Sequence, residues 1–167
     1  LSGAYPEKDI IQAGFTISEL ISNKYYTFDT KYTKLMLIDE KVIDNQIFVN
    51  SCNDTTLPII YDENITRYEM TVLLQKNISI KRICFVFDYT REYELFNGEL
   101  LFVDGEKNEN TQFMITTLNR FKITALDFLA CNTLKDEKWK RYYDVLFENT
   151  GVVIGASDDT TGNIKYG

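Results

Sequence analysis

The residue best suited to nucleophilic chemistry in this chain is Cys131, which follows the apolar run 125–130 and precedes Asn132. A short apolar run of this kind predicts a buried strand, with the thiol at its carboxyl end. A cysteine nucleophile needs an adjacent base or a positive environment that favours the thiolate. The 167 residues include no histidine, which excludes an ordinary Cys–His pair within this chain. A buried, unreactive thiol is the simpler interpretation of Cys131.

Polar side chains also follow three other apolar runs, at 35–38, 80–87 and 151–156. These side chains are Asp39, then Asp88, then Ser157 with Asp158. Carboxylates at such positions could take part in acid–base chemistry or hold a cation. Aspartate is also common after strands because it closes the following turn, and that interpretation carries more weight here.

The segment 157–163 is rich in oxygen-bearing side chains. Asp158, Asp159 and Asn163 could attract Ca²⁺ or a glycan. The segment lacks the alternating spacing of an EF-hand loop and its closing glutamate. A turn is therefore the favoured interpretation, and a Ca²⁺- or glycan-binding surface module is kept as a weaker alternative.

Composition excludes several classes of protein. The net charge of −7 argues against nucleic-acid binding, and the basic cluster near Lys138 and Arg141 is interrupted by acidic neighbours as on a solvated helix face. Three scattered cysteines without histidine predict unpaired thiols, no zinc site, no other metal site and no cofactor. The chain has no Walker loop, dinucleotide fingerprint or nucleophile elbow. No apolar run approaches the roughly 20 residues that span a bilayer.

Strand and helix patterns alternate along most of the chain. Buried strands are expected at 35–38, 57–61, 80–87, 125–130 and 151–156, and helices at 66–77, 112–121 and 137–149. Asn97-Gly98 lies between two short apolar runs and predicts a β-hairpin with a type I′ turn. This order predicts an α/β, three-layer fold with a mostly parallel sheet of about five strands and a hairpin insertion. Ligands of such sheets bind beyond the carboxyl ends of the strands.

Residues 1–29 contain an internal repeat of ten residues. Tyr5, Phe15 and Tyr25 align, and Thr16 with Glu19 has the spacing of a capping box that opens a short helix. Such short helices must stack on neighbours to bury their apolar faces. We therefore expect an all-α repeat segment at 1–29, the end of an upstream array, followed by the α/β domain at 34–167.

Several blocks of the sequence resemble an uncharacterised "domain of unknown function" family with a caspase–haemoglobinase-like fold. The blocks are Leu37-Ile-Asp39-Glu-Lys-Val42, Leu126-Asp-Phe-Leu-Ala-Cys131-Asn132, Thr150-Gly151, Ala156-Ser-Asp-Asp-Thr-Thr-Gly162-Asn163 and Tyr166-Gly167. The family occurs in large bacterial adhesin-like proteins and in giant-virus proteins. The repeats at 1–29 resemble Ala-Gly-Phe-Thr-type repeats of giant-virus and protist proteins.

The resemblance implies a caspase-like domain whose catalytic pair is incomplete. Cys131 matches the position of the nucleophile, whereas the position of the histidine falls on or near Asp88. The family pattern continues past Gly167, which implies that the domain is truncated at its C-terminus. A viral member would be found in the virion or host cytoplasm, and a bacterial one at the cell surface.

Three functions follow as hypotheses. The first is a non-catalytic structural or protein-interaction module of a larger giant-virus or surface protein, whose partners are other copies or virion or surface components. Its binding loops would retain Asp39, Asn132, Ser157, Asp158, Asp159 and Asn163. The second is a cysteine hydrolase or self-processing peptidase that uses Cys131 with an unconventional base. The third is the Ca²⁺- or glycan-binding module.

Overall fold

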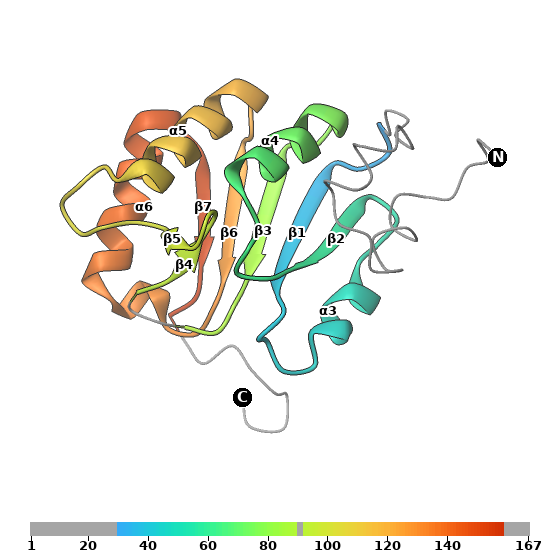
Figure 1. The fold of residues 1–167 in the computed structure, drawn as a ribbon, viewed down its shortest axis with the longest axis horizontal. Helices are drawn as coiled ribbons and strands as arrows, with labels where there is room; N and C mark the ends of the chain where they lie inside the picture. Colours follow the sequence, from blue (N-terminus) through green and yellow to red (C-terminus); the bar gives the residue numbers. More distant parts are fainter. Residues whose placement is uncertain (1–29, 90–91, 159–167) are drawn as a thin grey trace.

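The computed structural model describes residues 30–89 and 92–158. The predicted repeats at 1–29 and the candidate residues Asp159 and Asn163 lie outside these ranges. A central sheet of five parallel strands has the order β2-β1-β3-β6-β7 (Figure 1). Its strands are β1 (Lys34–Asp39), β2 (Thr56–Tyr61), β3 (Arg82–Val86), β6 (Ala125–Leu129) and β7 (Val153–Ala156). The expectation of a parallel five-stranded sheet is confirmed.

Helices connect consecutive strands of this sheet on both sides (Figure 1). They are α3 (Asn45–Ser51), α4 (Arg67–Lys76), α5 (Glu109–Phe121) and α6 (Glu137–Thr150), with a 3-10 turn, η1 (Thr133–Lys135), before α6. From β1 to β2 the chain moves across the sheet in one direction, and from β2 onward every connection moves in the other direction. Because such connections are right-handed, α3 lies on one face of the sheet and α4, α5 and α6 lie on the other. The predicted three-layer α/β architecture is confirmed.

The apolar core lies mainly under α4, α5 and α6. Alternate residues of the strands, such as Leu35, Phe85 and Phe128, are fully buried there. The Trp139 ring of α6 stacks on Phe87 at 5.4 Å between centroids and contacts Phe102 edge-on at 4.8 Å. A smaller cluster on the α3 face contains Ile38, Val49, Cys84 and Val86. The two clusters come from opposite faces of the same strands, as strand periodicity requires.

Local signals fix the starts and ends of the helices. Thr66 accepts a hydrogen bond from the Glu69 N–H and the Glu69 carboxylate accepts one from the Thr66 N–H, so the predicted capping box opens α4. Asp136 caps the N-terminus of α6, and Gly151, with φ of 70°, ends it in the left-handed conformation. These caps satisfy backbone groups that the helices themselves leave unpaired.

The predicted hairpin lies between β3 and α5 and is confirmed with shorter strands. β4 (Glu94–Leu95) pairs antiparallel with β5 (Glu99–Leu100). Asn97 and Gly98 both have positive φ, and the Glu99 N–H donates to the Phe96 carbonyl across them, as in a type I′ turn. Phe96 also has positive φ, so it belongs to the turn. The first strand of the hairpin therefore ends at Leu95, one residue before the end of the predicted run.

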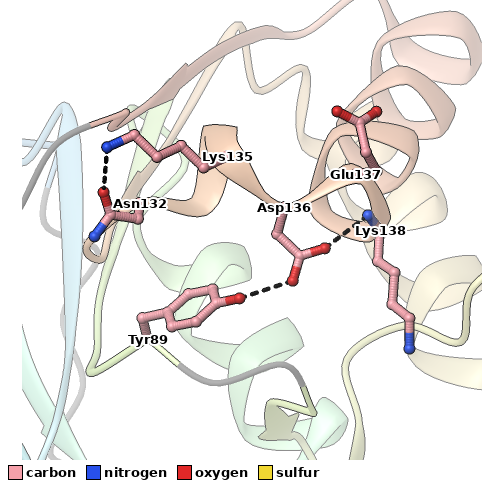
Figure 2. Close-up of a pocket in the computed structure, with 6 residues that line it drawn as sticks. All are labelled: Tyr89, Asn132, Lys135, Asp136, Glu137 and Lys138. Carbon is pink, nitrogen blue, oxygen red and sulfur yellow. Dashed lines mark hydrogen bonds between the residues drawn. The ribbon is translucent and has the colours of Figure 1, made fainter.

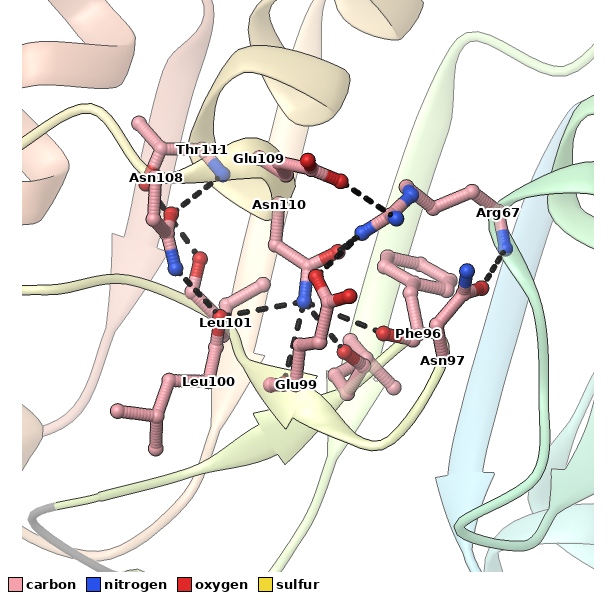
Figure 3. Close-up of polar contacts among 11 residues, drawn as sticks. Arg67, Phe96, Asn97, Glu99, Leu100, Leu101, Asn108, Glu109, Asn110 and Thr111 are labelled. Atoms are coloured by element: carbon pink, nitrogen blue, oxygen red, sulfur yellow. Dashed lines mark hydrogen bonds and ion pairs between the residues drawn. The ribbon is translucent and has the colours of Figure 1, made fainter.

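A buried amide fastens this hairpin to the domain (Figure 3). The Asn110 side-chain NH₂ lies 2.6–3.3 Å from the carbonyl oxygens of Leu95, Phe96, Glu99 and Leu100. The Asn110 oxygen accepts a hydrogen bond from Arg67, whose guanidinium also pairs with Glu99 and Glu109. Polar contacts therefore hold α4, α5 and the hairpin together, and the Asn110 side chain at their centre is fully buried.

Three elements differ from the sequence expectation. Helix α3 was not predicted, α5 begins three residues before Gln112 with Asn108 as its cap, and the fourth predicted strand ends at Leu129, before Cys131. Among the described residues, no helix is both long and apolar enough to cross a bilayer.

Candidate functional site

The polar residues predicted at the strand ends do share one edge of the sheet. Asp39 is the last residue of β1, Asp88 follows β3 after Phe87, Cys131 follows β6 after Ala130, and Ser157 comes directly after β7. These four strands are neighbours and parallel, so their carboxyl ends lie together. We call this region, formed by the loops after β1, β3, β6 and β7, the carboxyl edge.

Cys131 lies in a turn rather than in the strand. Its side chain is half-buried, and it forms no disulfide bond in the described structure. The next residue, Asn132, has φ of 57°, a conformation that asparagine tolerates better than most residues. The Asn132 side-chain oxygen accepts a hydrogen bond from Lys135 Nζ at 3.0 Å, and its carbonyl accepts one from the Lys135 N–H. Asn132 thus builds the turn that opens η1.

Asp39 and Asp88 have different surroundings at this edge. Asp39 Oδ1 accepts a hydrogen bond from the Lys41 N–H at 2.9 Å, which is the turn-closing role of a strand-end aspartate. Burial, with a smaller effect of the Asp39 carboxylate, raises the pKa of the Tyr61 phenol. Tyr61 therefore stays protonated, and its hydroxyl pairs with that of Tyr93 in the core. Asp88 is exposed to solvent.

A pocket of about 300 Å³ opens beside the turn at Asn132 (Figure 2). Its lining residues are Tyr89, Asn132, Lys135, Asp136, Glu137 and Lys138. The Tyr89 hydroxyl donates to Asp136 Oδ2 at 2.8 Å, and Asp136 Oδ1 accepts the Lys138 N–H at 2.8 Å. Two lysines and two carboxylates line the pocket, so neither sign of charge dominates it. Cys131 and Asp88 flank this pocket in sequence but are absent from its lining.

Most of these pocket residues were missed as site residues from the sequence. Lys138 and its acidic neighbours were interpreted as a solvated helix face, although Asp136 before the helical pattern is a recognisable N-cap signal. Tyr89 reaches them because β3 and β6 are adjacent, which the strand patterns alone do not reveal. The structure thus brings Asn132 to Tyr89 and the start of α6.

The segment after β7 contributes less than predicted within the described residues. The Ser157 carbonyl accepts a hydrogen bond from the Leu134 N–H at 3.0 Å, which ties η1 to the end of β7. Asp158 is exposed. Over residues 30–89 and 92–158, no group of three or more His, Cys, Asp or Glu side chains is placed to hold a metal ion.

Comparisons with known proteins provide no relative for this chain. No family model, no curated protein and no solved structure matches it. The resemblance to a caspase-like family therefore stays a proposal that rests on the quoted sequence blocks, and the site must be interpreted from its own geometry.

Proposed function

We propose that the domain at 34–167 is a non-catalytic structural or protein-interaction module, a degenerate caspase-like domain of a larger giant-virus or surface protein. One observation carries the proposal. Asp88 follows β3, where the family resemblance places a histidine, and the chain has no histidine at all. Cys131 therefore has no imidazole of its own chain to remove its proton.

The contacts at the carboxyl edge support this proposal. Tyr89 bonds to Asp136, Lys135 bonds to Asn132, and the Ser157 carbonyl bonds to Leu134. Each of these bonds closes a turn or fixes a neighbouring loop. Polar groups used in this way stabilise the fold, which is a different role from that of a nucleophile–base–orienter arrangement.

Exposed apolar side chains at the same edge support a protein partner. Ile43, in the loop after β1, is 82% exposed, Leu129 at the end of β6 is 38% exposed, and Tyr89 after β3 is 37% exposed. They come from the ends of three adjacent strands. Leu129 faces the hollow on the α3 side and Tyr89 the pocket beside α6, so apolar surface is exposed on both sides of this edge, where a protein partner could cover it. We propose other copies of the protein, or virion or surface components, as the partners.

The reactivity of Cys131 tests the non-catalytic part of the proposal. The whole chain is treated near neutral pH with an iodoacetamide probe, and labelling is assigned to each cysteine by peptide mass. We expect Cys131 to react no faster than the thiol of glutathione, and Cys52 serves as an internal half-buried reference. Accelerated labelling at Cys131 that disappears in Asp88→Asn would contradict the proposal.

The test of the partner surface uses charge placed at the carboxyl edge. Leu129→Asp and Ile43→Asp should weaken self-association measured by sedimentation, with Ile78→Asp as a control at an exposed position away from this edge. Equal behaviour of all three variants would argue against other copies as the partner and leave the virion or surface components for separate binding assays.

A cysteine hydrolase or self-processing peptidase is the second candidate. The observation that favours it is the half-buried position of Cys131, at the end of the strand next to the one that leads to Asp88. A substrate could reach such a thiol, whereas it could not reach the buried Cys84. Site-specific cleavage of the chain that stops in Cys131→Ala would establish this alternative.

A further inference from the structure

A second hollow lies on the α3 face of the sheet and reaches the carboxyl edge at Leu129. It is a groove of about 330 Å³ between the end of α3 and the strands β1, β3 and β6. Three sulfur-bearing side chains line it: Met36 of β1, Cys52 at the end of α3 and Cys84 of β3. We call this hollow the sulfur groove. Its three sulfur-bearing residues are not part of the proposed interaction surface.

The three sulfur atoms are brought together by the sheet and by the end of α3. Cys52 Sγ lies 3.7 Å from Met36 Sδ. Met36 and Cys84 are register partners on the neighbouring parallel strands β1 and β3, so both side chains point to the same face. Adjacent strands are about 4.8 Å apart, which keeps the two side chains in reach of one another. Cys52, at the end of α3, therefore lies over the face of the sheet that carries Met36 and Cys84.

The surroundings of Cys84 favour its neutral thiol in the resting protein. Burial, reinforced by Asp127 and by Cys52, raises the pKa of Cys84 to about 12, while Arg82 acts in the opposite direction. Lys34 and Arg82 are cationic lining residues, and Arg82 is held by Asp127 at 2.5 Å. Because Arg82 is already paired with Asp127, Lys34 is the cation that would partly balance the charge that develops when both thiols lose their protons.

We propose that Met36, Cys52 and Cys84 form a binding site for a soft monovalent metal ion of the Cu⁺ class. Thiolate and thioether ligands select such ions over hard cations. On binding, the two S–H bonds break and their protons leave to solvent, the two thiolates each form a Cu–S bond, and a lone pair of the Met36 sulfur forms the third Cu–S bond. The ion keeps its oxidation state, so the step needs no oxidant. A tetrahedral zinc site, by contrast, would require a fourth ligand.

Competition with a chromophoric Cu⁺ chelator, under anaerobic conditions and with the whole chain, tests the proposal. We expect one ion per chain and release of up to two protons for each ion bound. Cys52→Ser should lower the affinity by about 100-fold or more, because even partners outside the ligand shell contribute about 10–100-fold. Met36→Leu, which preserves side-chain volume, should lower it by roughly tenfold. Cys131→Ser is the matched control and should leave the affinity unchanged.

Three results would overturn the proposal. The first is a Cu⁺ affinity that is unchanged in both Cys52→Ser and Met36→Leu. The second is loss of binding in Cys131→Ser, which would assign the ion to the carboxyl edge. The third is Cu⁺ binding without any release of protons, because thiols that keep their protons cannot be thiolate ligands. Because Cys84 is buried, Cys84→Ser can unfold the groove, so circular dichroism must confirm its fold before its affinity is counted.

Discussion

Replacing Asn110 by aspartate removes the side-chain donor that holds the β4–β5 hairpin while nearly preserving side-chain shape. The Asn110 NH₂ group supplies two protons to four carbonyl oxygens, the nearest being that of Leu95 at 2.6 Å, and the residue is fully buried. Losing two net hydrogen bonds costs about 2 kcal/mol, and leaving buried carbonyls unpaired adds about 1 kcal/mol. We therefore expect Asn110→Asp to lower the free energy of unfolding by about 3 kcal/mol near pH 7.

Urea unfolding followed by circular dichroism measures this loss. With a urea dependence of about 2 kcal/mol per molar, the midpoint should fall by roughly 1.5 M. Gln112→Glu is the matched control, because it makes the same amide-to-carboxylate change in the first turn of α5 at an exposed position. Both changes place a negative charge near the same helix N-terminus, so their difference isolates the buried contacts.

The dependence on pH sharpens the test. Burial beside carbonyl oxygens should raise the pKa of the introduced carboxyl group above its unfolded value, against the opposing effect of Arg67, whose charge is already shared with Glu99 and Glu109. The loss of stability is then complete above that raised pKa, and it is relieved as the pH falls and the carboxyl regains a donor proton. An Asn110→Asp loss equal to that of Gln112→Glu, or one that does not shrink toward pH 4, would refute the role given to Asn110.

Three further predictions concern stability. Cys84→Ala should lower the free energy of unfolding by about 1 kcal/mol near pH 7. Burial raises the pKa of Cys84 to about 12 in the folded protein, whereas an unfolded thiol has a pKa of about 8.5, so the wild-type protein loses stability as the pH rises through that interval. The difference between wild type and variant, measured by urea unfolding at a series of pH values, should therefore shrink there. A Cβ at Gly155 would overlap Asp127 Oδ1, so Gly155→Ala should cost about 1–3 kcal/mol, and a double-mutant cycle with Asp127→Ala should recover part of that loss. Thr66→Ala removes the capping-box hydroxyl and should cost about 1 kcal/mol in thermal or urea unfolding, whereas Thr116→Ala, at an exposed position within α5, should cost less than about 0.5 kcal/mol.

The sheet was predictable because its strands carry their own signals. Runs such as Leu35–Ile38 are apolar enough to be buried on both faces, and the alternation with helices implies parallel pairing. Helix α3 was missed because only Val49 of its residues is buried and its N-cap, Asp44, makes no side-chain capping bond. A seven-residue helix with one buried side chain has no amphipathic period to detect.

The candidate site was predictable only in part, for a different reason. Strand ends could be read from the sequence, so Asp39, Asp88 and Cys131 were placed at one edge correctly. The side chains that come into contact at this edge are decided by strand order and by the turns, which the sequence does not reveal. Tyr89 and Asp136, for example, are far apart in the sequence and are hydrogen-bonded in the pocket. The buried role of Asn110 was hidden similarly, because an asparagine in the first turn of a helix usually faces solvent.

The strand order has a consequence for how the chain folds during synthesis. β1 and β2 can pair as soon as both have left the ribosome, but the other side of β1 stays open until β3 appears. After that, β6 and β7 each add to the outer edge in the order in which they are translated. Every intermediate therefore presents an unpaired apolar strand, and a ribosome that stalls between β3 and β6 would expose β3 as a template for aggregation.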